Sequence, residues 1–204
     1  MSQLKELLVE QLQDLLHAET QLTGALPKMV AAAHNPKLKE AFENHLVQTE
    51  GHVERLRSVF GLLGEKMEPK PCKAMMGLVE EGKETIEQGA GKQPLAADLA
   101  LIAAAQRVEH YEISAYGTAK SLARQIGQIE CARLLSHTLG EEESADFLLS
   151  AISEPLVQQA SLDDAGASVN LETVGDNAGK RSGAHGKKTA SKAGKGAEEI
   201  AVRR

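Results

Sequence analysis

The chain has 204 residues, of which 2% are aromatic and none is Trp, while Leu, Ala, Glu, Gln and Lys are frequent. Such a composition favours helices and argues against a β-sandwich or β-barrel, whose strands are rich in aromatic and β-branched residues. Residues 1–164 carry 15 basic and 25 acidic residues, and a body this acidic argues against a dedicated nucleic-acid-binding domain.

Four long helices are predicted, and the first two form a hairpin. Leu residues at steps of three and four predict a helix over residues 2–33, which Asn35-Pro36 ends. The second helix covers about residues 36–62 and ends near Gly64. Because the loop between these helices has only a few residues, they must be antiparallel neighbours.

A long connection follows at residues 63–94, where several Pro and Gly residues surround the amphipathic segment AMMGLVEEGKETIE. We predict one short helix in this connection, and further long helices over about residues 95–125 and 128–157. Two antiparallel hairpins joined by one long crossover define the ferritin-like bundle, whereas an up-down-up-down bundle needs only short loops. The sequence therefore predicts an all-α, ferritin-like four-helix bundle over residues 1–162.

The composition changes near residue 163. Residues 163–204 are rich in Gly, Ala, Ser and Lys, and we expect them to form a disordered tail. Residues 165–204 carry eight basic and four acidic residues, so this tail could bind polyanions weakly and without specificity.

Cysteine usage and the N-terminal segment indicate the cellular compartment. Cys72 and Cys131 form neither a CxxC pair nor a disulfide framework. The segment MSQLKELLVEQ lacks the apolar stretch of a signal peptide, and no run of about 18 apolar residues occurs. We therefore expect a cytoplasmic protein with reduced thiols and no contact with a membrane.

Each long helix places polar side chains among its inward-facing apolar ones. With about 100° of rotation per residue, Glu19 falls between Leu residues of the first helix, and His45 faces inward on the second. Glu109 and Glu112 share an inward face on the third long helix, and Glu142 faces inward on the fourth. Carboxylates in a bundle core are unfavourable unless something pairs with them, and divalent metal ions pair with several at once. We therefore predict a metal site made by five residues: Glu19, His45, Glu109, Glu112 and Glu142.

Five further residues are weaker candidates. Thr49 and Thr138 could donate hydroxyl hydrogen bonds to the carboxylates and so orient them. Tyr116 lies on the inner face, where simple packing or a hydrogen bond to a ligand would both fit. His52 is the second imidazole candidate, although we expect it nearer the boundary of the bundle. Asp146 lies beside Glu142 on the fourth long helix.

Two functional hypotheses remain open. Di-iron bundles of the usual kind take a Glu-x-x-His pair from each of two helices, but this chain has no Glu-x-x-His run and its i, i+3 pair is Glu109-x-x-Glu112. The first hypothesis is a site for one or two iron or manganese ions, redox-active toward oxygen or peroxide. The alternative is a structural or interaction protein whose carboxylates form a metal-free hydrogen-bonded network. Whether the protein is an enzyme stays open.

Several runs of residues resemble the YciE/YciF family of ferritin-like bacterial stress proteins. In order along residues 3–158 they are AETQL, HLVQTEGHVERL, AMMGLVEEGKETIE, ALIAAAQRVEHYEISAYGT and LLSHTLGEEESAD. The resemblance implies a ferritin-like fold, a homodimer, a two-metal site in the bundle and a role in a bacterial stress response. Family members often carry an acidic residue where this chain has Gln48, and helical phase places residue 48 off the inward face.

Overall fold

A computed structural model describes residues 2–172 of the chain. These residues form five helices and no strand: α1 (Gln3–Ala32), α2 (Pro36–Leu63), α3 (Lys73–Gly89), α4 (Pro94–Gln125) and α5 (Ile129–Glu172). The short helix predicted in the crossover is α3, and the long helices begin and end close to the predicted positions except at the end of α5. Within this described part of the chain, no helix combines the length and the hydropathy needed to cross a membrane.

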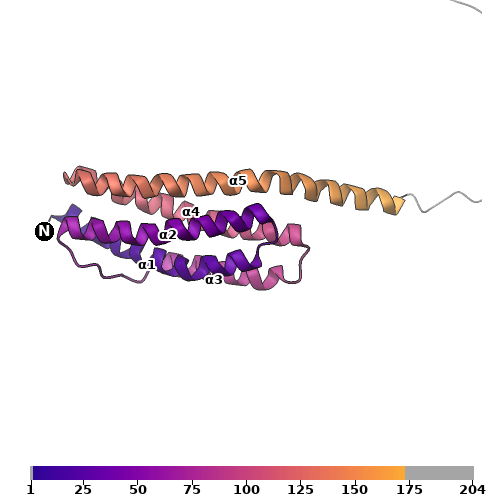
Figure 1. Cartoon of the computed structure of the whole chain (residues 1–204), viewed down its shortest axis with the longest axis horizontal. Coiled ribbons are helices and arrows are strands. Elements are labelled where there is room, and N and C mark those ends of the chain that lie inside the picture. Colours follow the sequence, from indigo (N-terminus) through magenta and orange to yellow (C-terminus); the bar gives the residue numbers. More distant parts are fainter. Residues whose placement is uncertain (1, 173–204) are drawn as a thin grey trace, which may run out of the picture.

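The end of α5 differs from the prediction. The sequence predicts a last helix that ends near residue 157, but α5 continues to Glu172 and runs past the other helices (Figure 1). Residues 156–165 contain neither Pro nor Gly, so nothing in them breaks the helix. The rest of the predicted tail, residues 173–204, lies outside the described residues.

Local sequence signals fix the helix ends. The side chain of Ser2 accepts a hydrogen bond from the backbone amide of Lys5 at the start of α1, and Asn35 caps α2 ahead of Pro36. Gly64 ends α2 in the left-handed conformation, with φ of 68°, which glycine adopts without a Cβ penalty. These caps hold α1 and α2 at the lengths that the sequence predicts.

The long helices form two antiparallel hairpins, α1 with α2 and α4 with α5. Because α2 also packs against α5 and α1 against α4, the four helices enclose one core (Figure 1). The short helix α3 packs on α1 and α4 from outside. The opposite face, made by α2 and α5, has no such cover within residues 2–172. This arrangement is the predicted ferritin-like bundle with one long crossover.

The core has three layers along the bundle axis. One apolar cluster, with Leu12 and Phe60 among its members, fills the end where α1 and α5 begin. A second apolar cluster, with Leu38 and Ile102 among its members, fills the other end. Between them every long helix carries buried acidic or imidazole side chains, which we call the polar layer. Its members are Glu19, His45, His52, Glu109, Glu112 and Glu142.

Candidate metal centre

The polar layer brings together all five predicted ligands. Glu19 comes from α1, Glu109 and Glu112 come from α4, and Glu142 comes from α5, and the most exposed member of the layer is only 6% exposed. The prediction that His52 lies near the bundle boundary is wrong, because its side chain is 0% exposed. His52 follows His45 by seven residues, which is close to two helical turns, so both imidazoles face the same way on α2.

Two groups of side chains in this layer could each hold a metal ion. The first contains His45, Glu109, Glu112 and Glu142, and the second contains Glu19, His52 and Glu142. Within each group one ligand atom of every residue lies within 4.8 Å of the others. Glu142 belongs to both groups, so the two groups share one carboxylate side chain.

The two carboxylate oxygens of Glu142 face different imidazoles. Its Oε2 lies 3.7 Å from Nε2 of His45, and its Oε1 lies 2.9 Å from Nδ1 of His52. Each imidazole also approaches a second carboxylate: His45 Nε2 lies 3.3 Å from Glu109 Oε1, and His52 Nδ1 lies 3.3 Å from Glu19 Oε1. The inward nitrogen of each imidazole therefore faces two carboxylates, and these three groups are among the ligands that one bound cation would contact.

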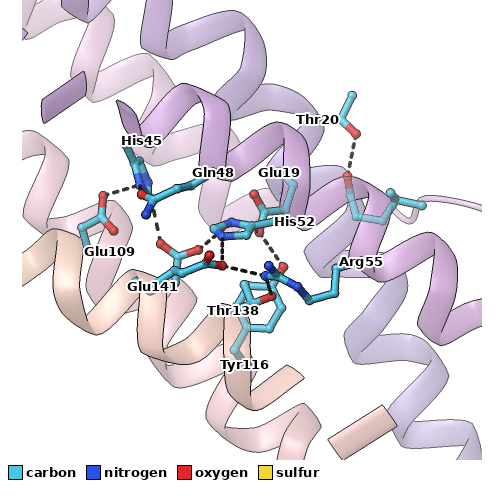
Figure 2. Close-up of polar contacts among 12 residues, drawn as sticks. Glu19, Thr20, His45, Gln48, His52, Arg55, Glu109, Tyr116, Thr138 and Glu141 are labelled. Carbon is cyan, nitrogen blue, oxygen red and sulfur yellow. Dashed lines mark hydrogen bonds and ion pairs between the residues drawn. The ribbon is translucent and has the colours of Figure 1, made fainter. Parts of the chain in front are cut away.

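The outward nitrogens of both imidazoles contact oxygen acceptors, as Figure 2 shows. His45 Nδ1 lies 3.3 Å from Oε1 of Gln48, and His52 Nε2 lies 3.0 Å from Oε2 of Glu141. An outward N–H donated to such an oxygen leaves a lone pair on the inward nitrogen, which is how proteins orient metal-binding histidines. Neither of these two orienting side chains was predicted from the sequence.

Glu141 is itself held from outside. Arg55 Nη1 donates hydrogen bonds to Glu141 Oε2 at 2.7 Å and to Thr138 Oγ1 at 2.5 Å (Figure 2). Partial burial raises the pKa of Glu141, but Arg55 outweighs burial and holds the pKa below its usual range. Thr138 Oγ1 thus accepts a hydrogen bond from Arg55, and its predicted donation to a core carboxylate is not observed among the described residues.

The other weak candidates have different outcomes. Tyr116 is fully buried and its hydroxyl donates to Glu19 Oε1 at 2.5 Å, so it contacts a predicted ligand. Thr49 is buried, but its hydroxyl has no hydrogen-bond partner among the described residues, so the predicted bond to a carboxylate is not formed. Asp146 lies outside the layer, where it accepts a hydrogen bond from Gln106 at 3.0 Å.

Burial and crowding decide which groups of the layer carry protons. Burial, with the nearby charges of Glu142 and Glu19, raises the pKa of Glu109 and Glu112 well above the usual range. Burial also raises the pKa of Glu19. For His52, burial lowers the pKa, but contacts with Glu142 and Glu19 outweigh it and raise the pKa to about 10. The same contact with His52 outweighs the burial of Glu142 and lowers its pKa.

Hydrogen bonding within the layer is incomplete. Eight buried side-chain atoms of the layer, including both oxygens of Glu112, and the hydroxyl of the neighbouring Thr49 make no hydrogen bond of good geometry within residues 2–172. Of these atoms, His52 Nδ1 and Glu142 Oε1 still lie within ion-pair distance of each other. A buried carboxylate elsewhere behaves differently: Asp98, which is 3% exposed, accepts from the backbone amides of His34 at 2.8 Å and Asn35 at 2.7 Å. Since buried polar atoms are nearly always paired, the donor set of the polar layer fits bound cations, whereas Asp98 ties α4 to the α1–α2 turn.

Comparisons with known proteins identify the family. Residues 3–162 match the family described as a domain of unknown function, DUF892. Protein YciF of Escherichia coli K12 is 42% identical over 154 residues, which cover 75% of this chain and 92% of YciF. The crystal structure of the E. coli stress protein YciF superimposes with a TM-score of 0.74, covering 78% of this chain and 99% of that one.

Two other solved structures are similar. YcfI from Rhodopseudomonas palustris, for which a structural role has been suggested, is 39% identical, with a TM-score of 0.70 over 74% of this chain and 94% of its own. A protein from Xanthomonas campestris is 23% identical, with a TM-score of 0.58 over 78% of this chain and 99% of its own, and supports the fold alone. From the match over residues 3–162 and the 42% identity to YciF, we conclude that the chain belongs to the DUF892 family.

Proposed function

We propose that this protein binds two divalent first-row metal ions in its polar layer and acts in a bacterial stress response. The observation that carries the metal proposal is the shared carboxylate: two ligand groups meet at Glu142, and each contains one imidazole. The stress response is extended to this chain from YciF, which is described as a stress protein. A bundle core with several carboxylates and imidazoles from four helices is typical of two-metal sites.

Charge balance supports two ions rather than one. The polar layer contains four carboxylates and two imidazoles, all nearly inaccessible to solvent. Four ionised carboxylates beside two neutral imidazoles carry a charge of −4, which two divalent cations neutralise. A single cation neutralises only half of this charge, so two of the carboxylates would have to stay protonated and could not act as ionised ligands.

Iron or manganese is the expected metal, because carboxylates with a few imidazoles suit both. Such a pair, when bound, supplies redox chemistry toward oxygen or peroxide. The chain's own contribution is to hold the ligands and exclude water. Tyr116 fixes Glu19 through its hydroxyl, and the apolar clusters at the two ends of the bundle close the layer along the axis.

Metal analysis of the purified protein tests this proposal. We expect about two iron or manganese ions per chain in protein purified anaerobically from iron- and manganese-replete cells. A Glu109→Ala, Glu112→Ala double variant is expected to lose most of this metal. The matched control is Glu80→Ala, Glu84→Ala, since both residues are exposed on α3. Less than about 0.1 metal per chain in the wild type, or full stoichiometry in the Glu109, Glu112 variant, would reject the proposed site.

A metal-free structural role is the second candidate function. The raised pKa values of Glu109 and Glu112 favour it, because neutral carboxylic acids can remain buried without a cation. The structural role suggested for YcfI points the same way.

Replacing Glu112 by Leu separates the two candidates. Apolar residues often replace buried ionisable groups with a gain of roughly 1–4 kcal/mol in the free energy of unfolding, so Glu112→Leu stabilises a protein that never binds metal. If the protein binds metal, the same variant is less stable than the wild type once iron or manganese is added. Thermal unfolding with metal and with a chelator distinguishes the two results.

A further inference from the structure

The polar layer is reached from outside through one face of the bundle. A pocket of about 500 Å³ lies between α2 and α5, with Phe42, Gln48 and Ala145 among its lining residues. It lies on the face opposite α3, which packs on α1 and α4. Its inner end reaches His45 and Glu109, which are otherwise buried at 6% and 3% exposed.

Only one of the two ligand groups contacts this pocket. His45 and Glu109 line it, and both belong to the first group. Glu19 and His52, which complete the second group with Glu142, are both 0% exposed and do not line it. An ion held by the first group would therefore have an open side that faces the pocket, whereas an ion held by the second group would not.

The pocket walls indicate the kind of molecule that fits. Phe42, Ala145 and Leu149 give it apolar sides, while Gln48 and Ser144 offer neutral hydrogen-bonding groups. The volume lies within the range of roughly 300–1,000 Å³ that is usual for small-molecule sites. Oxygen or hydrogen peroxide alone would need only a narrow channel, whereas an open pocket of this size with partly apolar walls has room for a ligand with an organic body.

The charges that line the pocket indicate where the polar end of the ligand binds. No Lys or Arg lines the pocket within the described residues, and its acidic lining residue is Glu109. A negatively charged head group would be repelled there unless a cation lies at the inner end. Binding of such a ligand should therefore depend on the metal.

We propose that this pocket binds a small molecule with an oxygen donor at one end and a short apolar body, and that the donor reaches the metal ion held by the His45 group. Short-chain carboxylates and alkyl hydroperoxides share this chemistry. The inference rests on the proposed metal function and adds a ligand class and an entry side to it.

Cobalt-substituted protein tests the inference without any catalytic turnover. Co²⁺ takes the same nitrogen and oxygen ligands as iron and manganese, and its visible absorption reports a new ligand. We expect formate through hexanoate to change this spectrum with an affinity that rises about fourfold per added methylene until the pocket is full, the gain for burying one CH₂. Metal-free protein should not bind these carboxylates.

Two pocket variants act in opposite directions. Ala145→Leu narrows the pocket and should remove most of the gain with chain length, while leaving the number of bound Co²⁺ ions unchanged. Leu148→Ala widens the mouth, where this side chain is 45% exposed, and should shift the tightest binding to longer carboxylates. The matched controls are Ala151→Leu, at an exposed position of α5, and Leu62→Ala, where Leu62 is 51% exposed on α2.

Each outcome bears on one of the two proposals. If Co²⁺ binds but the carboxylates leave its spectrum unchanged, or if both pocket variants keep the same dependence on chain length as the wild type, the inference is wrong and the metal site stands. Equal carboxylate binding by metal-free protein also overturns the inference. If wild-type protein binds no Co²⁺, the proposed function fails and the inference fails with it. An effect of peroxides without any effect of carboxylates contradicts the shared ligand chemistry.

Discussion

The two halves of the polar layer have similar ligands but different surroundings. The half around His45 opens onto the α2/α5 pocket, and the outward nitrogen of its imidazole faces the neutral amide of Gln48. The half around His52 is closed, and the outward nitrogen of that imidazole faces Glu141, which Arg55 holds in turn. Two ligand groups that share one carboxylate can therefore have unequal surroundings: one group is reached from a pocket, and the other is enclosed.

Loss of the shared carboxylate should have the largest effect, because it removes the feature that joins the halves. We expect Glu142→Ala to weaken binding at both positions by more than about 100-fold, since even the partners that orient metal ligands cost 10–100-fold when removed. In the metal-free protein it leaves His52 with Glu19 as its one remaining carboxylate partner in the layer, and breaking a buried ion pair costs about 3–5 kcal/mol.

Calorimetric titration with Mn²⁺ and chemical unfolding of the metal-free protein measure both effects. The control is Glu143→Ala, because Glu143 is exposed on the same helix. Normal binding at either position in Glu142→Ala would show that this carboxylate does not join two ions.

Removal of one imidazole at a time should separate the halves. We expect His45→Ala to lose the ion beside the pocket and His52→Ala to lose the enclosed ion, so that each variant keeps about one ion per chain. Metal analysis after dialysis gives the stoichiometry, and the carboxylate-induced spectral change of the cobalt form should survive only in His52→Ala. Loss of both ions in both variants would mean that the halves form one cooperative site.

The composition of the polar layer was largely predictable from the sequence. Helical phase selected the five predicted ligands because each helix otherwise shows apolar residues at those positions, and the structure buries all of them. Phase also places His52, at i+7 from His45, on the inward face, and the structure buries it there instead of at the predicted boundary. Asp98 was missed although it lies three and four residues before the buried Leu101 and Ile102.

The partners of the imidazoles were harder to predict. Glu141 and Arg55 are separated by 86 residues in the chain, and their contact depends on how α2 packs against α5. Periodicity within one helix gives the face of a side chain but not its neighbour on another helix. A local signal did exist, because Gln48 follows His45 by three residues just as Arg55 follows His52, and residues three apart are neighbours on a helix.

Metal binding should depend on pH because several ligands hold protons in the metal-free protein. Burial raises the pKa of Glu109 and Glu112, and contacts with carboxylates outweigh burial to raise the pKa of His52 to about 10. A bound cation must displace these protons. Metal affinity should therefore rise with pH, by about tenfold per pH unit for each proton released. Calorimetry in two buffers of different ionisation enthalpy counts the protons, and a release of none would contradict the protonation pattern.

The same shifts set the stability of the metal-free fold. A raised pKa means that the folded state holds its proton more tightly, so the stabilisation is complete below the unfolded pKa and is lost as pH rises through the folded pKa. For His52 that window runs from 6.5 to about 10. Thermal unfolding in a chelator should therefore show falling stability across this range. A constant or rising stability there would show that His52 is not the imidazolium partner of Glu142.

The smallest expected effects come from the side chains that orient the imidazoles, and they should differ between the halves. Glu141→Ala removes a charged acceptor that lies 3.0 Å from His52 Nε2, and loss of such a partner typically costs 10–100-fold in metal affinity. Gln48→Ala removes a neutral acceptor at 3.3 Å from His45 Nδ1, and hydrogen bonds to neutral groups are about half as strong as those to ionised ones. We therefore expect a clearly smaller loss of metal affinity for Gln48→Ala, confined to the ion beside the pocket.

Stepwise Mn²⁺ titration of both variants resolves the two positions, with Glu43→Ala as an exposed control on α2. Equal losses of metal affinity in the two variants would mean that enclosure by α5, rather than the charge of Glu141, makes the halves different. In that case Arg55→Met, which removes the ion pair between Arg55 and Glu141, should leave the enclosed ion bound as in the wild type.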